Sequence, residues 1–314
     1  MKRIIKITFP FIIALCSQFS AQSQTEQDAI MMGKQQFCTG ILAGQSQFNQ
    51  YWEGSFKRDN LNIGTIQSTA VGMMGNYGIT SKLNALISFP YISNKATAGT
   101  LKGHHGIQDL NLWIKWMPIE EQTNYGLISF YFLGGYSTPL SNYIADYLQL
   151  AIGSKSKTVS GRMMLDYQIG SFFVTGSASY HLRSNIKIER NAYYTDQLIL
   201  SDRVDLPNMN SWGIRTGYRN HGWIAEILYY QNTTLGGTDI RRNDMPFPSN
   251  KMNSTQLGFN LKYEFNSGLS LLANGNTTLR GRNVGASKSL QAGVVYIFDL
   301  SSLFSKKQVN DEKK

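Results

Sequence analysis

Apolar and polar residues alternate one by one along most of this chain, between about residue 45 and residue 298. In residues 256–265 the odd positions hold Leu, Phe, Leu, Tyr and Phe, and the even positions hold Gln, Gly, Asn, Lys and Glu. The same two-residue period recurs in residues 109–117, 159–169 and 172–182. Because successive side chains of a strand point to opposite faces, each stretch predicts a β-strand with one apolar and one polar face.

The pattern predicts about twelve strands, which are joined by links of two kinds. The predicted strands are 45–55, 65–79, 82–93, 107–117, 125–137, 158–169, 172–184, 210–219, 223–232, 254–265, 269–280 and 288–298. The first strand is the least regular, because residues 40–52 alternate poorly. Every second link is short, as at Gly170-Ser171, although the link 118–124 is longer than the other short ones. The remaining links are long and polar: 56–64, 94–106, 138–157, 185–209, 233–253 and 281–287.

This division of the links favours a membrane barrel over a soluble sandwich. Outer-membrane barrels have short periplasmic turns and long extracellular loops, whereas a sandwich has no reason to put its long loops on one side. The predicted strands are also longer than those of globular sheets and long enough to cross a membrane at a tilt. Aromatic residues near strand ends, such as Trp113, Trp116 and Trp223, are typical of interfacial girdles. We therefore predict an all-β fold, a transmembrane antiparallel β-barrel of about 12 strands.

The chain divides into four predicted segments. Residues 1–23 have a basic start, an apolar run at 7–16 and a small-x-small site at Ala21-Gln22-Ser23, which together predict a signal peptide cleaved near Ser23. Residues 24–44 form an N-terminal segment that either stays in the periplasm, plugs the barrel or adds to it. Residues 45–298 form the barrel and 299–314 a polar tail. An even number of strands places both termini on the periplasmic side.

A set of short motifs in residues 48–185 has the order and spacing of a known family. Residues 76–83 are Asn-Tyr-Gly-Ile-Thr-Ser-Lys-Leu, residues 88–91 are Ser-Phe-Pro-Tyr, residues 106–110 are Gly-Ile-Gln-Asp-Leu and residues 134–139 are Gly-Gly-Tyr-Ser-Thr-Pro. They resemble the barrel family linked to the meta-pathway of phenol degradation, which is distantly like the long-chain fatty-acid transporters. The resemblance implies an outer-membrane channel for hydrophobic or aromatic compounds. The N-terminal plug of those transporters, with its own motif, is not evident in this sequence.

The last strand resembles the signal by which outer-membrane proteins are assembled. Gln291, Gly293, Tyr296 and Phe298 fill the polar, glycine and two aromatic places of that signal. The chain departs from the usual pattern by the tail that follows Phe298. The resemblance implies two partners, the outer-membrane assembly machinery and outer-membrane lipid.

The polar face of the predicted strands carries many charged residues, which we expect to face the lumen. These are Asp109, Lys115, Arg162, Asp166, His181, Arg183, Arg215, Arg219, Glu226, Lys262, Glu264 and Arg280. One interpretation is a charge network that fills and rigidifies the barrel. The other is an aqueous path whose charges bias passage. A twelve-stranded barrel lies between small filled barrels and wide open porins, so both interpretations stand.

The long link 138–157 carries an apolar stripe at helical spacing. The stripe predicts a short amphipathic helix that offers Tyr143 and Tyr147 to an apolar ligand at the pore mouth. The same helix fits equally against the outer rim of the barrel or at the lipid interface.

Little in the sequence suggests catalysis, a metal or nucleic acid. His181 and Ser184 are three residues apart on one strand and face opposite sides, so they do not form a nucleophile–base pair. His104-His105 lacks acidic or cysteine residues at ligand spacing. The net charge of +10 is scattered and includes no basic run suited to nucleic acid. We expect no enzyme activity, no cofactor and no metal.

The sequence thus predicts a channel or transporter in the outer membrane of a Gram-negative cell. We expect passive movement of small, mainly hydrophobic or aromatic, molecules. The alternative is a non-transporting structural, adhesive or receptor barrel that displays its extracellular loops, above all 185–209 and 233–253, which are rich in Asn, Asp, Arg and Tyr.

Overall fold

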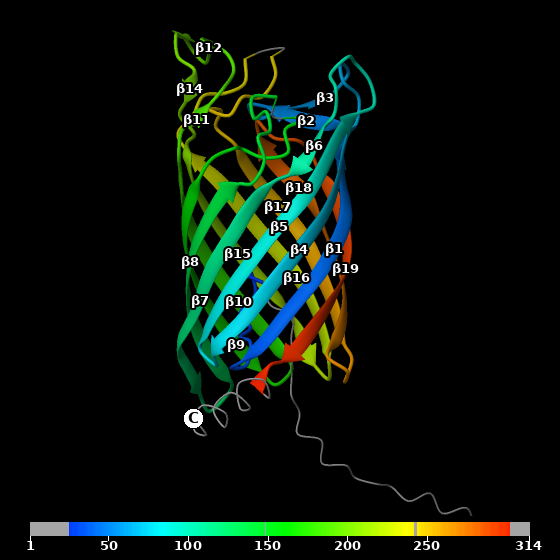
Figure 1. The fold of residues 1–314 in the computed structure, drawn as a ribbon, viewed down its shortest axis with the longest axis vertical. Coiled ribbons are helices and arrows are strands. Elements are labelled where there is room, and N and C mark those ends of the chain that lie inside the picture. The colour runs from blue at the N-terminus through cyan, green and yellow to red at the C-terminus, as the bar shows by residue number, and fades with distance from the viewer. Residues whose placement is uncertain (1–24, 148, 242–243, 302–314) are drawn as a thin grey trace, which may run out of the picture.

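Long antiparallel strands close into a single barrel in the computed structural model, which describes residues 25–147, 149–241 and 244–301 (Figure 1). The twelve barrel strands are β1 (Gln36–Phe48), β4 (Ile66–Thr80), β5 (Leu83–Ala96), β7 (Asp109–Gln122), β8 (Leu127–Pro139), β9 (Thr158–Ile169), β10 (Phe172–Arg183), β15 (Asn208–Asn220), β16 (Trp223–Leu235), β17 (Asn253–Glu264), β18 (Leu269–Arg282) and β19 (Lys288–Asp299). Each pairs with its neighbours in sequence, and β1 closes the barrel by pairing with both β4 and β19. The short β6 (His104–Ile107) pairs with β5 above β7 and extends that strand.

The links differ at the two ends of the barrel, as predicted. At one end the turns are short, and His221 and Gly222 both have positive φ (50° and 78°), as a two-residue type I′ hairpin requires. At the other end the long loops carry three small ribbons (Figure 1): β2 (Gln50–Glu53) with β3 (Phe56–Asp59), β11 (Ile186–Lys187) with β14 (Arg203–Val204), and β12 (Tyr193–Tyr194) with β13 (Leu198–Ile199). The predicted signal peptide with its cleavage site, and residues 302–314 of the tail, lie outside the described residues.

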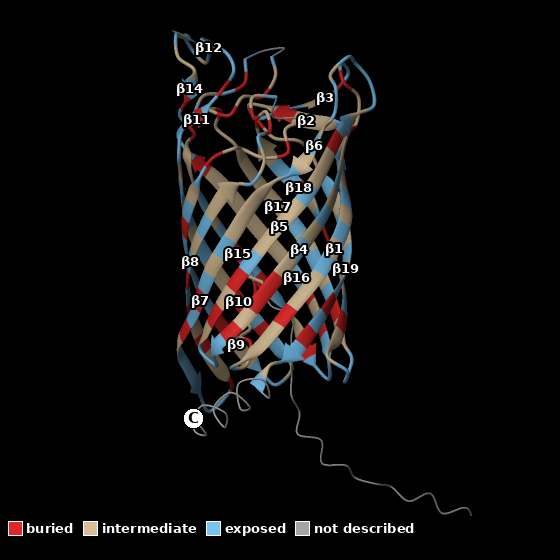
Figure 2. Ribbon diagram, viewed as in Figure 1, coloured by how far each residue is buried: buried red, intermediate tan, exposed pale blue. Residues whose placement is uncertain are grey.

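The outward face of the barrel carries large exposed apolar side chains on its strands. Exposed Ile114, Leu165, Ile227 and Leu257 are examples from four different strands. Aromatic side chains ring the short-turn end, where Trp223 packs on Tyr263 with ring centroids 4.6 Å apart. An exposed apolar belt bordered by aromatic rings is what a barrel shows to lipid. Buried residues gather instead in the lower half of the barrel and among the loops (Figure 2).

No helix in the described part of the chain is long and apolar enough to cross a membrane.

The first strand corrects the sequence prediction. It begins at Gln36 and ends at Phe48, whereas the pattern indicated 45–55 and placed the start of the barrel at 45. Inward-facing Leu42 and outward-facing Gln45 break the alternation, and two further inward positions are glycines. A Cβ on Gly40 would lie 2.6 Å from the Val294 carbonyl oxygen, and one on Gly44 would lie 2.3 Å from Gln291 Cγ. Close strand approach therefore requires glycine at these two positions.

Two further predictions about the strands are corrected. Trp113 is not in an interfacial girdle but faces the lumen, where Arg162 lies 5.3 Å above its ring. The predicted link 118–124 is largely strand, since β7 continues to Gln122 past an irregularity between Trp116 and Ile119.

Candidate functional site

The N-terminal residues 25–35, called the plug below, run inside the barrel and lead into β1. Lys115 of β7 is fully buried beneath this segment, and its ammonium group donates to three main-chain oxygens. The acceptors are the carbonyl oxygens of Thr25 (2.8 Å), Asp28 (2.7 Å) and Ile30 (3.0 Å). The carboxylate of Asp28 lies 3.1 Å away and forms an ion pair with the same ammonium group. One buried lysine thereby ties together a turn of the plug.

Three other side chains of the barrel wall donate to the plug carbonyls that Lys115 does not bind. Arg162 of β9 donates to Glu26 O (2.6 Å) and Arg215 of β15 to Gln27 O (3.0 Å). Tyr131 of β8 donates to Ala29 O (2.9 Å). Every carbonyl from residue 25 to residue 30 therefore has a side-chain donor on the barrel wall. Buried carbonyls need such partners, and bonds from charged donors are the stronger kind.

The plug is held through its main chain on one side and by apolar contact on the other. Met32 is 1% exposed and packs with Cys38, Val295 and Ile297 on β1 and β19. Residues 25–30 make no backbone–backbone hydrogen bond with any described strand. Residues 25–30 are thus seated inside the barrel without being part of its ladder of strands, whereas Gln35 bonds to Gly78 of β4.

A buried ionic network lies below the plug. Arg215 forms an ion pair with Glu226, and Arg219 lies 3.1 Å from Asp166 and 3.9 Å from the other oxygen of Glu226. Asp166 also accepts a hydrogen bond from Thr175. These residues are at least nine-tenths buried, so their mutual pairing is what makes the charges tolerable in this position. The predicted charge network is present in this half of the barrel.

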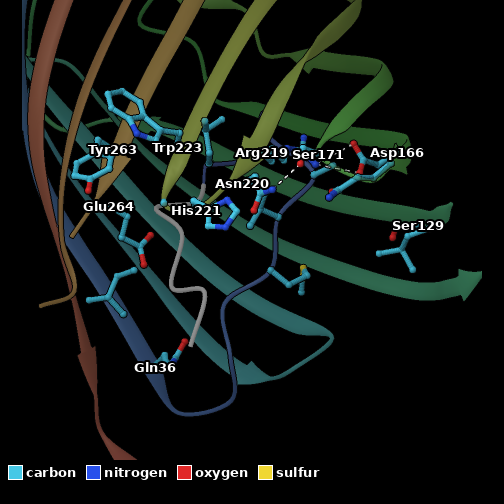
Figure 3. A pocket seen from close by; sticks show the side chains of 18 of the residues that line it. Gln36, Ser129, Asp166, Ser171, Arg219, Asn220, His221, Trp223, Tyr263 and Glu264 are labelled. Carbon is cyan, nitrogen blue, oxygen red and sulfur yellow. Dashed lines mark hydrogen bonds and ion pairs between the residues drawn. The ribbon is translucent and has the colours of Figure 1, made fainter. Parts of the chain in front are cut away.

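Cavities lie on both sides of the plug. A vestibule of about 1070 Å³ opens at the short-turn end. Figure 3 shows Asp166 and Arg219 together on one side of it, with Trp223, Tyr263 and Glu264 on the other. A polar chamber of about 450 Å³ and an apolar pocket of about 300 Å³ both adjoin Thr25 and Glu26 at the tip of the plug. Plug residues line all three cavities, and the aqueous path stays a prediction.

The remaining charged candidates are placed as follows. His181 faces inward between Ser160 (2.7 Å) and Ser211 (3.4 Å). Arg183 donates to Pro207 O with its Nε (2.7 Å).

At the periplasmic end, Lys262 forms an ion pair with Glu264 (3.0 Å). Arg280 contradicts the prediction, because a bulge between Thr255 and Gln256 sets it opposite Thr255 on the outward side of the sheet. A bulge of one residue reverses the parity of every residue beyond it.

The two tyrosines proposed as ligand residues lie in the loop above the barrel. The described part of residues 138–157 contains turns but no helix, so the predicted amphipathic helix is wrong. Tyr143 is buried: its hydroxyl donates to Asp109 (2.6 Å) and accepts from the amide of Lys155 (2.8 Å). Burial and the Asp109 carboxylate raise the pKa of Tyr143. With both bonds made, this hydroxyl holds the loop to the barrel instead of facing a ligand.

Tyr147 is 42% exposed and stacks on His104, with ring centroids 6.3 Å apart.

The assembly-signal residues alternate as a lipid-facing strand requires. Tyr296 and Phe298 face outward and contact each other, with ring centroids 4.6 Å apart, whereas Gln291 lines the polar chamber. Gly293 pairs with Leu42 on the neighbouring strand. Their role in assembly stays a prediction.

Sequence reasoning missed several residues of this site: Tyr131, Trp113 and the plug residues Glu26 and Asp28. An aromatic residue on a strand suits either face, and an irregular segment bound by its carbonyls leaves no side-chain pattern. One available signal was the inward-facing Lys115. The residues that pair with it on the two neighbouring strands, Asn84 and Leu133, are not acidic, so its partner had to come from elsewhere.

No protein-family model matches this sequence, and no curated protein matches it. Solved structures do resemble the barrel. The outer-membrane channel from Pseudomonas putida F1 superimposes with a TM-score of 0.70 at 14% identity, over 88% of this chain and 100% of that one. The NanC porin (TM-score 0.45, 9% identity, 81% and 98% covered) and the translocator domain of the autotransporter NalP from Neisseria meningitidis (0.42, 11%, 82% and 88%) are less similar. The first comparison shows a shared outer-membrane barrel fold.

Proposed function

We propose that this protein is a channel in the outer membrane of a Gram-negative cell. It moves small, mainly hydrophobic or aromatic, molecules passively, and the structure corresponds to its plugged state. The apolar belt with its aromatic borders supports insertion in lipid. The fold shared with the Pseudomonas putida channel supports the same class of protein.

The observation that carries the proposal is the way in which the plug is bound. Side chains of the wall hold six successive plug carbonyls, but residues 25–30 share no backbone ladder with the strands. Residues 25–33 can therefore leave without breaking any strand pairing. A segment that only filled the barrel would have no need to stay free of backbone bonds to the strands. With the plug displaced, the vestibule and the polar chamber become one passage.

The nature of the solute is supported by the wall opposite the charged network. The apolar pocket is lined by Leu42, Met74, Leu86, Pro90 and Trp113. The motif resemblance in residues 76–91 points to the same class of hydrophobic or aromatic compounds.

The test is flux through liposomes that contain the refolded mature chain. A matched panel of aromatic, aliphatic and sugar solutes is compared between the wild type and a variant that lacks residues 25–33. We expect selective passage of the apolar members and a larger flux in the variant, because the obstruction is gone. Absence of flux for every solute in both proteins, from barrels that still show heat-modifiable migration, contradicts the channel.

The loops favour a second candidate function, in which the barrel displays a binding surface. Large apolar side chains stand exposed in the loops, including Leu61 (86%), Leu200 (81%) and Phe56 (70%). Exposed apolar groups of this kind mark contact sites for partners. If deletion of residues 189–201 leaves cell-surface binding intact, this receptor or adhesive role fails for that loop.

A further inference from the structure

The apolar pocket, called the side pocket below, is a built cavity in the lumen wall. It lies between β1, β4, β5 and β7, holds about 300 Å³ and is lined by Trp113 of β7. Gly72 supplies much of its width, because a Cβ there would find only Pro90 nearby, at 3.9 Å. An engineered apolar cavity of about 150 Å³ takes up benzene. The side pocket therefore has room for one aromatic ring with a short substituent.

A cation stands at the mouth of this pocket. The guanidinium of Arg162 lies 5.3 Å from the Trp113 ring, and its Nε donates to Ser179 (2.7 Å). Among the described residues no carboxylate lies within ion-pair distance of Arg162. The polar chamber that Arg162 lines and the side pocket share Leu42, Met74 and Gln291, so the two spaces adjoin. A ligand with its body in the side pocket can reach Arg162 with a polar head.

The plug occupies the place of such a head group. Arg162 receives the carbonyl of Glu26, and the only described carboxylate that pairs with Lys115 is Asp28, which also belongs to the plug. Lys115 and Arg162 both lie opposite Leu133 of β8, so they flank one strand at the same level. When the plug leaves, Lys115 loses its oxygen partners and Arg162 keeps only the Ser179 hydroxyl. A buried cation without a partner is unfavourable, so an anionic occupant suits the vacated site.

We propose that the lumen binds a small amphipathic carboxylate, with its ring or short apolar chain in the side pocket and its carboxylate on Arg162. This inference rests on the proposed channel function and specifies the solute. Arg162 supplies a planar fork of donors that matches the two oxygens of a carboxylate. The apolar pocket and the cation together exclude sugars, which lack both features of the ligand.

Benzoate, benzamide and acetate form a matched set of probes. Benzamide keeps the ring without the charge, and acetate keeps the charge without the ring. Binding of each to the full mature protein in nanodiscs is measured by calorimetry, with empty nanodiscs as the blank for lipid partition. We expect benzoate to bind at least tenfold tighter than either of the others. Equal affinities for benzoate and benzamide overturn the proposal.

Two substitutions separate the parts of the site. Arg162→Gln should remove the preference for benzoate over benzamide, whereas Arg162→Lys should retain part of it. Gly72→Leu should fill the side pocket and abolish binding of both aromatic probes. The matched controls are Arg280→Gln, an arginine on the outward side, and Gly161→Leu, where an added Cβ meets nothing within 4 Å. Wild-type binding by Arg162→Gln or by Gly72→Leu, in barrels with wild-type heat-modifiable migration, overturns the site.

Binding is measured without transport, so the two proposals fail separately. Benzoate binding in a barrel that passes no solute removes the channel and leaves the site. Flux of apolar solutes without any benzoate preference leaves the channel and removes the carboxylate site.

Discussion

The two walls of the lumen differ in chemistry, and the plug touches both. The charged wall, formed by β7, β9, β15, β16 and β17, presents buried cations such as Lys115 and Arg215. The apolar wall, formed by β19, β1, β4 and β5, presents Cys38, Met74, Leu86 and Val295.

Each wall binds a different part of the same segment. The plug gives its carbonyls to the charged wall and the Met32 side chain to the apolar wall. The charged wall therefore binds mainly the main chain, which any sequence can offer, and adds the Lys115–Asp28 ion pair and apolar contacts with Ala29. The apolar wall binds through the Met32 side chain.

The largest expected effect comes from the charged wall, through Lys115→Met. The substitution removes three carbonyl bonds and leaves Asp28 buried without its partner, at a cost of about 3–5 kcal/mol in plug docking. Hydrogen exchange of the N-terminal peptide, followed by mass spectrometry, should become much faster. Lys187→Met is the control, because that lysine side chain is 77% exposed and its ion pair with Asp202 contributes little. Unchanged exchange in Lys115→Met contradicts the role of the charged wall.

The apolar wall should contribute less. Met32→Ala removes a buried side chain and should weaken plug docking by about 2–3 kcal/mol, at the low end for such a truncation because the vestibule lets the site relax. The same exchange experiment measures it. Met73→Ala is the control, since Met73 is 46% exposed on the outward face. A larger effect in Met32→Ala than in Lys115→Met reverses the comparison of the two walls.

The loop latch at the extracellular end should have a smaller effect again. Tyr143→Phe leaves Asp109 and the Lys155 amide without their partner, at a cost of about 1–2 kcal/mol, local to this loop. Because the pKa of Tyr143 is raised in the folded protein, its stabilisation is complete below the ordinary tyrosine pKa of about 10 and is lost as pH rises through the folded value. Protease cleavage in residues 140–157 reports both changes. Equal cleavage of wild type and variant at neutral pH removes the latch.

The smallest effect belongs to the exposed ion pair of Asp239 and Arg282. The Arg282 hydrogen bond and that of Asn283 (2.7 Å) lower the pKa of Asp239. The stabilisation is therefore present above the ordinary aspartate pKa and is lost as pH falls through the lower folded value. Such an exposed pair contributes at most about 1 kcal/mol, less at high salt. Asp239→Asn should make loop cleavage independent of pH in this acidic range. A pH dependence that persists in the variant assigns it to another group.

Much of this fold could be predicted because lipid imposes one rule on every strand. Outward positions must be apolar, so parity alone placed Asp166, His181 and Glu226 on the inner face. Local exceptions to the rule caused the errors. Inward Leu42 and outward Gln45 hid β1, and the bulge beside Leu279 turned Arg280 outward.

The plug could not be predicted in the same way. Its fold depends on carbonyl groups, which every residue carries, and on donors from strands far away in sequence such as Lys115 and Arg162. The sequence marked these donors as inward-facing charges, but only the structure shows what they bind. Tyr143 is similar, since an apolar stripe does not reveal that its hydroxyl is bonded to Asp109.

The central claim is that a plug held by the charged wall closes an otherwise continuous lumen. Single-barrel conductance in planar bilayers tests it most directly, with the wild type, Lys115→Met and the Lys187→Met control recorded side by side. The account predicts rare openings in the wild type and the control, and a largely open state in Lys115→Met. A folded Lys115→Met barrel that conducts no more than the wild type would contradict it.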